Sequence, residues 1–291
     1  MGDIRNTGVE LALSGSVIRT KNIDWNISMN MSHNKTKILS LPATKTAGNG
    51  GFYESPYWYE ENGEMYNYMT YAFAGVDPET GEALYWYDED LSSKTTGGTN
   101  NISVPGKKKS GKTNQIGEAS RYTNGSILPK VFGGFSTTVK LWDFDISATF
   151  DYQLGGKVYD NRYAALMSPA TSAADAGQTY HVDVLKSWTA ENPNMEIPRW
   201  QYADDYTAYG DRFLTNASYL NFQSFTVGYT LPKKLTKNFG VSSLRVYAAG
   251  ENLCFWSKRK GLDPRYSYDG NESVSVYSPV RTIMGGIQLS F

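Results

Sequence analysis

The chain has 291 residues, a formal net charge of -1, one cysteine and two histidines. The near-neutral charge argues against a dedicated nucleic-acid-binding protein, which usually carries a basic face. A single cysteine excludes an internal disulfide and a zinc site built from cysteines, and two histidines leave little material for histidine-based metal sites or catalytic triads. We therefore expect neither a cofactor nor a metal ion.

Aromatic residues are abundant, at 14% of the chain, and 28 residues are glycine. This composition, without long apolar runs, favours an all-β protein. No stretch approaches the ~20 apolar residues of a transmembrane helix, but a membrane β-barrel remains allowed because only alternate residues of its strands face lipid. The first residues do not form a signal peptide, so the chain is expected either to be cytoplasmic or to lack its true beginning.

Apolar and polar residues alternate in many stretches, as in a strand with one apolar and one wet face. Examples are DWNISMNMS at 24–32, DFDISATFDYQ at 143–153 and TIMGGIQLSF at 282–291. The pattern predicts about nine strands, near 7–19, 22–35, 65–75, 82–88, 131–140, 142–153, 217–230, 243–254 and 281–291. Most of them reach the about 9–11 residues with which a tilted strand crosses a bilayer.

The predicted connections alternate in length. Short ones fall at 20–22, 77–81 and 141–143, with a moderate one at 231–242, and long ones fall at 36–64, 89–130, 154–216 and 255–280. Short turns at one end and long loops at the other are typical of an outer-membrane barrel. Aromatic residues near the predicted turns favour interfacial girdles, although strands are rich in aromatics in any case; they are Trp25, Trp142, Tyr219, Tyr229, Phe255 and Trp256.

GKKKSGKT at 106–113 matches the pattern of a phosphate-binding P-loop letter for letter. A working P-loop follows a buried strand and opens a helix. Here a polar stretch ending in Pro105 comes before it, and no apolar helical face follows. We interpret the stretch as a solvated, basic, flexible loop, which could touch an acidic glycan or lipopolysaccharide phosphates.

Three other motifs carry little chemistry. YDEDL at 87–91 lacks the alternate acids and the glycine of a calcium loop, so we expect a solvated loop. His181, Asp183 and Ser187 lie close in sequence, but nothing orients them as a triad. Cys254 is most simply a small apolar residue. These motifs indicate that the chain is not an enzyme.

Several long segments resemble a known family. The carboxyl-terminal part of the chain is similar to the end of the SusC/RagA family, TonB-linked outer-membrane transporters of Bacteroidetes-type bacteria, through RFLTNASYLNFQSFTVGYTLPKKL (212–235), LRVYAAGENLCFWSKRKGLDP (244–264) and YSPVRTIMGGIQLSF (277–291). Earlier segments resemble the same family in the same order: GDIRNTGVELAL (2–13), SHNKTKILSL (32–41), AGVDPETGEALYWYD (74–88) and LPKVFGGFSTTVKLWDFDISATFDYQLGGKVYD (128–160).

The resemblance implies an antiparallel transmembrane barrel of 22 strands in the outer membrane, of which residues 1–291 would supply about nine at the carboxyl-terminal end. It also implies a plug and amino-terminal domains that these residues do not contain, a TonB complex acting through that plug, and a SusD-like surface lipoprotein capping the barrel. An open arc of strands leaves two edges that lipid cannot satisfy. We therefore expect a truncated gene product or a piece that needs the rest of its barrel.

Substrate-binding candidates come from two aromatic and polar loop stretches, 53–68 and 198–213, and from the polar face of the strands. Flat rings stack on sugars and polar groups bind hydroxyls, and the same mixture suits peptides; the alternative is that the rings pack the loops together. The candidates are Tyr57, Trp58, Tyr59, Trp200 and Tyr202 in the loops, and Asp145, Asp151, Arg245 and Glu251 toward the lumen, where Gln153 and Tyr247 also point.

These observations favour the carboxyl-terminal barrel part of an energy-coupled importer of oligosaccharides or peptides, in contact with outer-membrane lipid and not with nucleic acid. Two alternatives remain at the level of sequence. One is a passive, porin-like channel segment. The other is a soluble β-sandwich that binds glycans, in which a second sheet would cover the apolar face of the strands.

Overall fold

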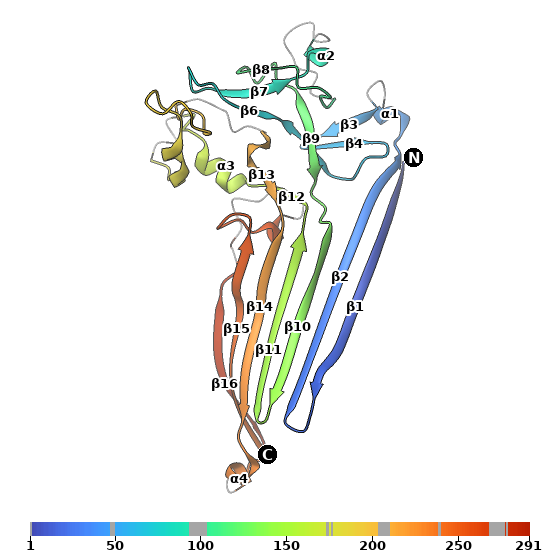
Figure 1. Cartoon of the computed structure of the whole chain (residues 1–291), viewed down its shortest axis with the longest axis vertical. Helices are drawn as coiled ribbons and strands as arrows, with labels where there is room; N and C mark the ends of the chain where they lie inside the picture. Colours follow the sequence, from blue (N-terminus) through green and yellow to red (C-terminus); the bar gives the residue numbers. More distant parts are fainter. Residues whose placement is uncertain are drawn as a thin grey trace.

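The computed structural model describes residues 2–46, 50–92, 104–172, 175, 177–202, 210–237, 240–267, 277 and 279–291. Long strands form a tall wall, and short strands and helices gather at one end of it, which we call the loop end (Figure 1). The opposite end of the wall, where the strands are joined by short connections, is called the turn end. The carboxyl terminus lies at the turn end, and the amino terminus lies at the loop end.

In the described part of the chain, seven strands form the wall, and each pairs antiparallel with the wall strand that follows it in the sequence. They are β1 (Asp3–Arg19), β2 (Ile23–Ser40), β10 (Val131–Leu141), β11 (Phe144–Leu154), β14 (Tyr219–Thr230), β15 (Ser243–Ser257) and β16 (Thr282–Ser290). The edges of this sheet are β1 and β16, so the described strands form an open arc. This arrangement confirms the antiparallel all-β class that the sequence predicts.

The strand register carries the sequence alternation across the whole wall. Thr149 lies opposite Ser136 and Ser224, whereas Phe150 lies opposite Phe135 and Phe222. The three phenylalanine rings stack side by side, with centroids 4.6 and 4.4 Å apart. One face of the wall is therefore polar, which we call the inner face, and the other is apolar, which we call the outer face.

Nothing in the described part of the chain covers the outer face. Large apolar side chains are exposed along it, including Val9, Leu11, Leu13, Ile27, Met29, Phe135, Phe144, Val246, Ile283, Ile287 and Leu289. A β-sandwich would bury this face against a second sheet. The exposed apolar face argues against the sandwich alternative and favours contact with hydrocarbon.

The turn end is closed by short connections. Thr20 Oγ1 accepts the backbone N–H groups of Asn22 and Ile23 at 3.3 and 3.0 Å, which fixes the turn between β1 and β2. Trp142, with φ of 52°, makes the tight turn between β10 and β11. The connection from β14 to β15 contains the short helix α4 (Lys233–Thr236).

The loop end holds three small sheets and several short helices. The sheets have the strand orders β3-β4-β5-β9, β6-β7-β8 and β12-β13. Their strands are β3 (Gly51–Glu54), β4 (Tyr57–Glu60), β5 (Asn67–Tyr71), β6 (Phe73–Val76), β7 (Ala83–Tyr87), β8 (Gly111–Thr113), β9 (Arg121–Ser126), β12 (Lys157–Tyr159) and β13 (Leu214–Asn216). The helices are α1 (Ala43–Thr46), α2 (Glu89–Ser92), α3 (Asn161–Met167), η2 (Val182–Lys186), η3 (Asp211–Phe213) and η5 (Pro264–Tyr266).

The described residues form seven wall strands, two fewer than the about nine that the sequence predicts. The predicted strands at 65–75 and 82–88 form β5, β6 and β7, which belong to the small sheets of the loop end. Residues 41–130 are thus one long connection between β2 and β10. The turn at 77–81 is real, with Asp77 Oδ1 accepting the N–H of Glu79 at 2.8 Å, but it lies at the loop end.

The aromatic girdle is only partly found. Trp142 is exposed at the turn end, and Trp256, opposite Leu220, is exposed on the outer face. Tyr219 and Phe255 instead belong to the inner face, where Arg265 lies over both rings, 5.9 and 4.4 Å from their centroids. Alternation decides the face of a strand residue, and proximity to a turn does not.

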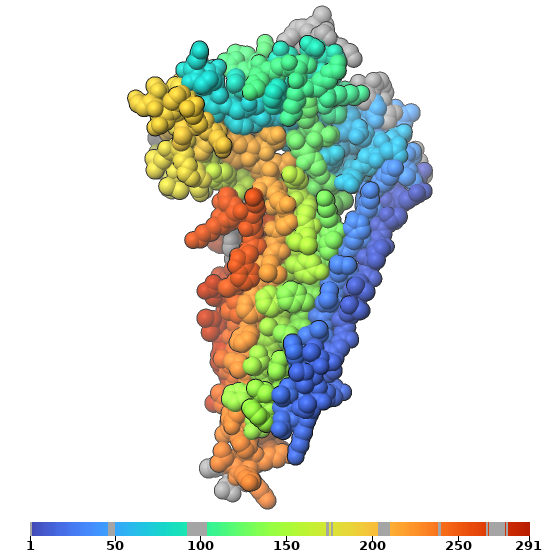
Figure 2. Space-filling view, in the orientation of Figure 1, coloured from blue at the N-terminus to red at the C-terminus, as the bar shows by residue number. Residues whose placement is uncertain are grey.

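The buried hydrophobic side chains lie at the loop end. They include Tyr57, Trp58, Tyr68, Met167 and Phe213, joined by Ile38 near the top of β2. Figure 2 shows the loop end as a broad mass above the narrower wall. No helix in the described residues is long and apolar enough to cross a membrane.

Candidate substrate-binding surface

The inner face of the wall is hollowed in its upper part. A hollow of about 670 Å³ is lined by polar and aromatic side chains from β2, β10, β11 and β14, among them Ser28, Asn30, Phe132, Asp151, Gln153 and Tyr219. Its floor contains Gly134, where an added Cβ would lie 2.9 Å from the carbonyl oxygen of Phe150. The missing side chain brings the backbone itself to the surface of the hollow.

Asp151 is the only charged residue among the described residues that line this hollow. Asn221, on the neighbouring strand, donates from Nδ2 to Asp151 Oδ1 at 2.7 Å, and Asn221 is itself buried. Gln153 Nε2 donates to the carbonyl of Ala217 at 3.2 Å. The hollow therefore offers amide, hydroxyl and carboxylate groups beside aromatic rings, a set that binds hydroxyls or peptide groups.

An ion pair occupies the inner face near the turn end. Arg245 Nε donates to Asp145 Oδ1 at 2.8 Å, and a second guanidinium nitrogen contacts Oδ2. The guanidinium also lies over the ring of Tyr247, 5.1 Å from its centroid. Gly228 lies between the two charged residues, and an added Cβ there would be 2.6 Å from Asp145 Oδ1. Glycine at this position leaves the path of the ion pair open.

Glu251 is exposed on the inner face, opposite Ser224 and Thr282. The four lumen candidates, Asp145, Asp151, Arg245 and Glu251, therefore all lie on one side of the wall. The structure brings Asp145 together with Arg245, whereas Asp151 pairs with Asn221. The sequence analysis missed Asn221 and Gly228, although Asn221 is signalled by its polar position within the alternation of β14.

The aromatic triplet in the first loop is buried. Tyr57, Trp58 and Tyr59 are 8%, 2% and 9% exposed, and Tyr57 and Tyr59 form a cluster with Tyr68 and Ile38. Trp58 Nε1 donates to Glu60 Oε2 at 3.0 Å, and burial raises the pKa of Tyr59 to about 12. These rings pack the loop onto the top of β2, which favours the packing alternative for them.

The second aromatic loop is more open. Trp200 packs edge-on against Tyr180, with ring centroids 4.6 Å apart, and its Nε1 is buried without a hydrogen-bond partner among the described residues. Tyr202 is 62% exposed. Of the five loop aromatics predicted from the sequence, Tyr202 is the most exposed, and Trp200 is half-buried.

The P-loop pattern is occupied by the protein itself. The backbone N–H groups of Lys107 and Lys108 donate to Asp88 Oδ2 at 2.8 and 3.0 Å, so they are not free to hold phosphate. Gly111–Thr113 forms β8, and the ammonium of Lys112 lies over Trp86, 5.1 Å from its centroid. The expectation of a wholly solvated loop is wrong for Asp88, which is buried.

Burial alone raises the pKa of Asp88, but the backbone N–H groups of Lys108, Lys107 and Asp90 outweigh it and hold the pKa below its usual value. Asp88 and Asp90 therefore hold the basic stretch by hydrogen bonds to Lys107 and Lys108. Among the described residues, no group of three or more His, Cys, Asp or Glu side chains is placed to hold a metal ion.

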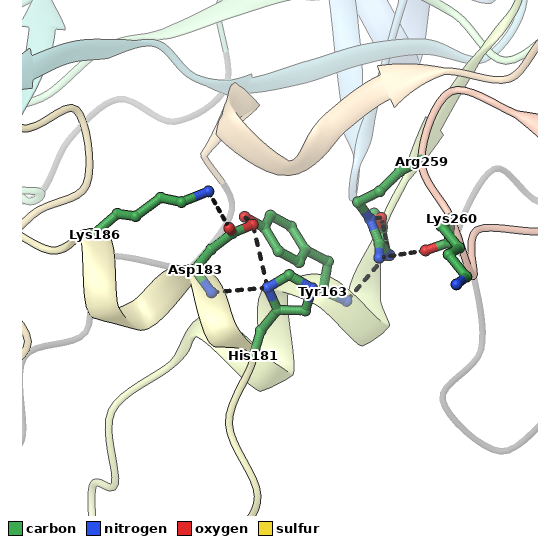
Figure 3. Close-up of polar contacts among 7 residues, drawn as sticks. Tyr163, His181, Asp183, Lys186, Arg259 and Lys260 are labelled. Carbon is green, nitrogen blue, oxygen red and sulfur yellow. Dashed lines mark hydrogen bonds and ion pairs between the residues drawn. The ribbon is translucent and has the colours of Figure 1, made fainter.

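His181 and Asp183 belong to a network at the loop end (Figure 3). Asp183 Oδ2 accepts the hydroxyl of Tyr163 at 2.8 Å, Lys186 Nζ donates to Oδ1 at 2.6 Å, and His181 Nδ1 accepts the N–H of Asp183 at 3.2 Å. The ring of His181 meets that of Tyr163 edge-on. Burial, and then the bond to Asp183, raise the pKa of Tyr163 to about 12.

This network is structural. Arg259 lies over the Tyr163 ring, 4.7 Å from its centroid, and pairs with the buried Asp160 at 2.5 Å, which ties two long connections together. The Oγ of Ser187 is buried with no hydrogen-bond partner among the described residues. Among the described residues no serine hydroxyl is hydrogen-bonded to His181, so the described cluster does not have the geometry of a triad.

The chain is similar in sequence to several known proteins. No family model matches the chain. All of it aligns with TonB-dependent receptor P3 of Formosa agariphila at 24% identity, with TonB-dependent receptor P26 of the same organism at 26%, and with TonB-dependent receptor SusC of Bacteroides thetaiotaomicron at 25%. The chain is homologous to TonB-dependent receptors, SusC among them. The SusC-like resemblance seen in the sequence is confirmed.

The solved structures agree on the fold. The RagAB peptide transporter matches all of the chain with a TM-score of 0.78 at 23% identity, and the RagAB peptide importer in its open-open state matches with a TM-score of 0.78 at 24% identity. The chain spans 29% of the length of the receptors P3 and P26 and 30% of the first RagAB chain. The chain is thus similar to one portion of these longer proteins.

Proposed function

We propose that residues 1–291 form the carboxyl-terminal portion of the barrel of a TonB-dependent outer-membrane importer of peptides or oligosaccharides. The observation that carries the proposal is the wall itself, with its uncovered apolar outer face and polar, hollowed inner face. In a membrane, lipid would bury the apolar outer face. The polar inner face would line the path of a polar solute. The homology to TonB-dependent receptors supports the same function.

In this function the chain binds and guides a substrate and makes or breaks no bond. Asp151 and the hollow around it would contact the substrate in the upper part of the path, followed by Glu251 and then the Asp145–Arg245 pair toward the turn end. At the loop end, Tyr202 and the neighbouring Trp200 would meet the substrate as it arrives. Rings that stack and amides that pair suit both a sugar chain and an extended peptide.

The partners follow from the two ends of the wall. A SusD-like surface lipoprotein would sit over the loop end, where the long connections form a broad surface (Figure 2). The TonB complex would act from the turn end, through a plug that lies outside these residues. RagAB is a peptide transporter, and its similarity in fold supports a peptide as one of the two substrate classes.

Transport by the complete gene product tests the proposal. A tagged receptor, expressed in its own host, is expected in the outer-membrane fraction with heat-modifiable migration. Uptake of a labelled peptide or oligosaccharide library should require the receptor and should stop when a protonophore removes the membrane potential. Uptake that survives the protonophore would indicate a passive channel, and a receptor found only in the soluble fraction would overturn the proposal.

The same uptake experiment tests Asp151 through the variant Asp151→Ala. Loss of a hydrogen bond to a charged group costs about 1.5–3 kcal/mol, so uptake at low substrate concentration should fall about tenfold or more. Glu118→Ala removes an acid at the loop end whose carboxylate accepts the hydroxyl of Thr113 at 3.0 Å, and it should leave uptake unchanged. Equal uptake by both variants would remove Asp151 from the substrate path.

A further inference from the structure

Three cations line up on the outer face of β1 and β2, where those strands rise toward the loop end. Arg5 lies directly opposite Lys37, and Lys35 lies opposite Thr7. They continue the side of the strands that carries Val9, Leu11 and Met31 below them, since the register is unbroken from Ile4 to Ser16. We call Arg5, Lys35 and Lys37 the rim cluster.

No acid of the described chain neutralises the rim cluster. None of its three side chains has an ion-pair partner among the described residues. The nearest acid along β1, Asp3, is hydrogen-bonded with Ser40, and Glu10 lies on the inner face. Like charges directly opposite each other destabilise a sheet. Arg5 and Lys37 are therefore placed where an anion from outside the chain would stabilise them.

The position of the rim cluster along the membrane normal indicates which anion would bind there. Lys35 lies ten residues beyond Trp25 on β2, and Trp25 lies next to the turn end. At about 3.3 Å per residue and a tilt of about 40°, that distance is about 25 Å along the membrane normal, the height of the apolar band of a barrel. Trp25 and Lys35 thus lie at the two borders of the band, and Lys35 meets the headgroups of the outer leaflet.

We propose that the rim cluster binds the phosphate groups of an outer-leaflet lipid, with its acyl chains on the apolar residues below. The inference rests on the proposed membrane orientation and adds a lipid site to it. Arg and Lys hold phosphate oxygens by charge-assisted hydrogen bonds, and Arg does so bidentately. His33, opposite Val9 at the border of the apolar band, is one step below the cluster.

The test uses the complete receptor purified in detergent and titrated with lipid, with bound lipid read by native mass spectrometry. The probes are bisphosphorylated lipid A and the same lipid with its phosphates removed. Each Lys or Arg near an anionic lipid surface adds to the binding free energy, so losing three of them should weaken lipid binding strongly. We expect Arg5→Gln/Lys35→Gln/Lys37→Gln to weaken binding of the bisphosphorylated lipid about tenfold or more, and to leave the dephosphorylated lipid unchanged.

A second triple variant controls for net charge. Lys233→Gln/Lys234→Gln/Lys237→Gln removes three positive charges at the turn end and should bind the lipid as the unmodified receptor does. Equal weakening in both variants, equal binding of the two lipids, or full competition by inorganic phosphate at equal concentration would overturn the lipid site. Heat-modifiable migration of each variant reports the folded barrel separately, so failure of the lipid site is distinct from failure of the importer proposal.

Discussion

Gly228 occupies the point where Arg245 crosses the inner face to reach Asp145. Gly228→Ala should push the two side chains apart, because the new Cβ would lie 2.6 Å from Asp145 Oδ1. The pair is partly exposed, so its loss should cost about 1 kcal/mol or less. In Asp145→Asn, which already breaks the pair, the same alanine should cost little more.

Thermal unfolding of the complete receptor in detergent measures this cycle. Gly285→Ala is the matched control, since a Cβ there would meet one backbone oxygen at an ordinary 3.7 Å. Equal loss of stability from Gly228→Ala in the presence and absence of Asp145 would show that the glycine serves another purpose.

Single residues of the site could be predicted from the sequence where strand geometry fixes their direction. Asp145, Asp151, Arg245 and Glu251 follow from alternation alone, because every second side chain of a strand points to the same face. Tyr57, Trp58 and Tyr59 could not be placed in this way, since a loop has no fixed period. Aromatic rings that suit a ligand suit a hydrophobic core equally well, and in this loop they form one.

At the scale of elements, the segment 106–113 has the pattern of a P-loop, but the carboxylate of Asp88 takes the place that phosphate would have. Asp88 accepts the N–H groups of Lys107, Lys108 and Asp90, and its own N–H donates to Ser120 Oγ at 2.9 Å. Asp88→Ala should therefore release the lysine-rich stretch. Trypsin added to intact cells at neutral pH should cleave it about tenfold faster or more, given about 1.5–3 kcal/mol for bonds to a charged group.

Asp90→Asn is the matched control, since it removes an exposed ion pair with Lys108 and should change cleavage little. The pH dependence has a definite sign, because the folded pKa of Asp88 is lowered. Its stabilisation should be complete above the unfolded pKa of about 3.9 and should be lost as pH falls through the lower folded value. Unchanged trypsin sensitivity in Asp88→Ala would contradict this role.

The strands of the loop end mark the limit of pattern reasoning for elements. β5, β6 and β7 have the composition and alternation of wall strands, but they span only four or five residues each. Such strands are too short to cross a bilayer, which needs about 9–11 residues. Their runs merge in the sequence across the bends between them, which raised the predicted number of wall strands from seven to nine.

At the scale of the whole molecule, the buried side chains lie where a soluble protein would not place them. The hydrophobic clusters hold the loop end together, whereas the wall below exposes apolar residues on its outer face. Hydrocarbon would bury that face, and the adjoining parts of a barrel would pair the edge strands β1 and β16. The rim cluster then marks the height at which the wall leaves the apolar layer.

Spin-label accessibility along β11 tests this central claim most directly. Single labels at positions 145 to 150 of the complete receptor, reconstituted in vesicles, are exposed to oxygen, which concentrates in lipid, and to a water-soluble nickel chelate. We predict that oxygen dominates at 146, 148 and 150 and that the chelate dominates at 145, 147 and 149. Uniform accessibility to the chelate, or exclusion of both reagents at the even positions, would contradict a wall with lipid on one side and water on the other.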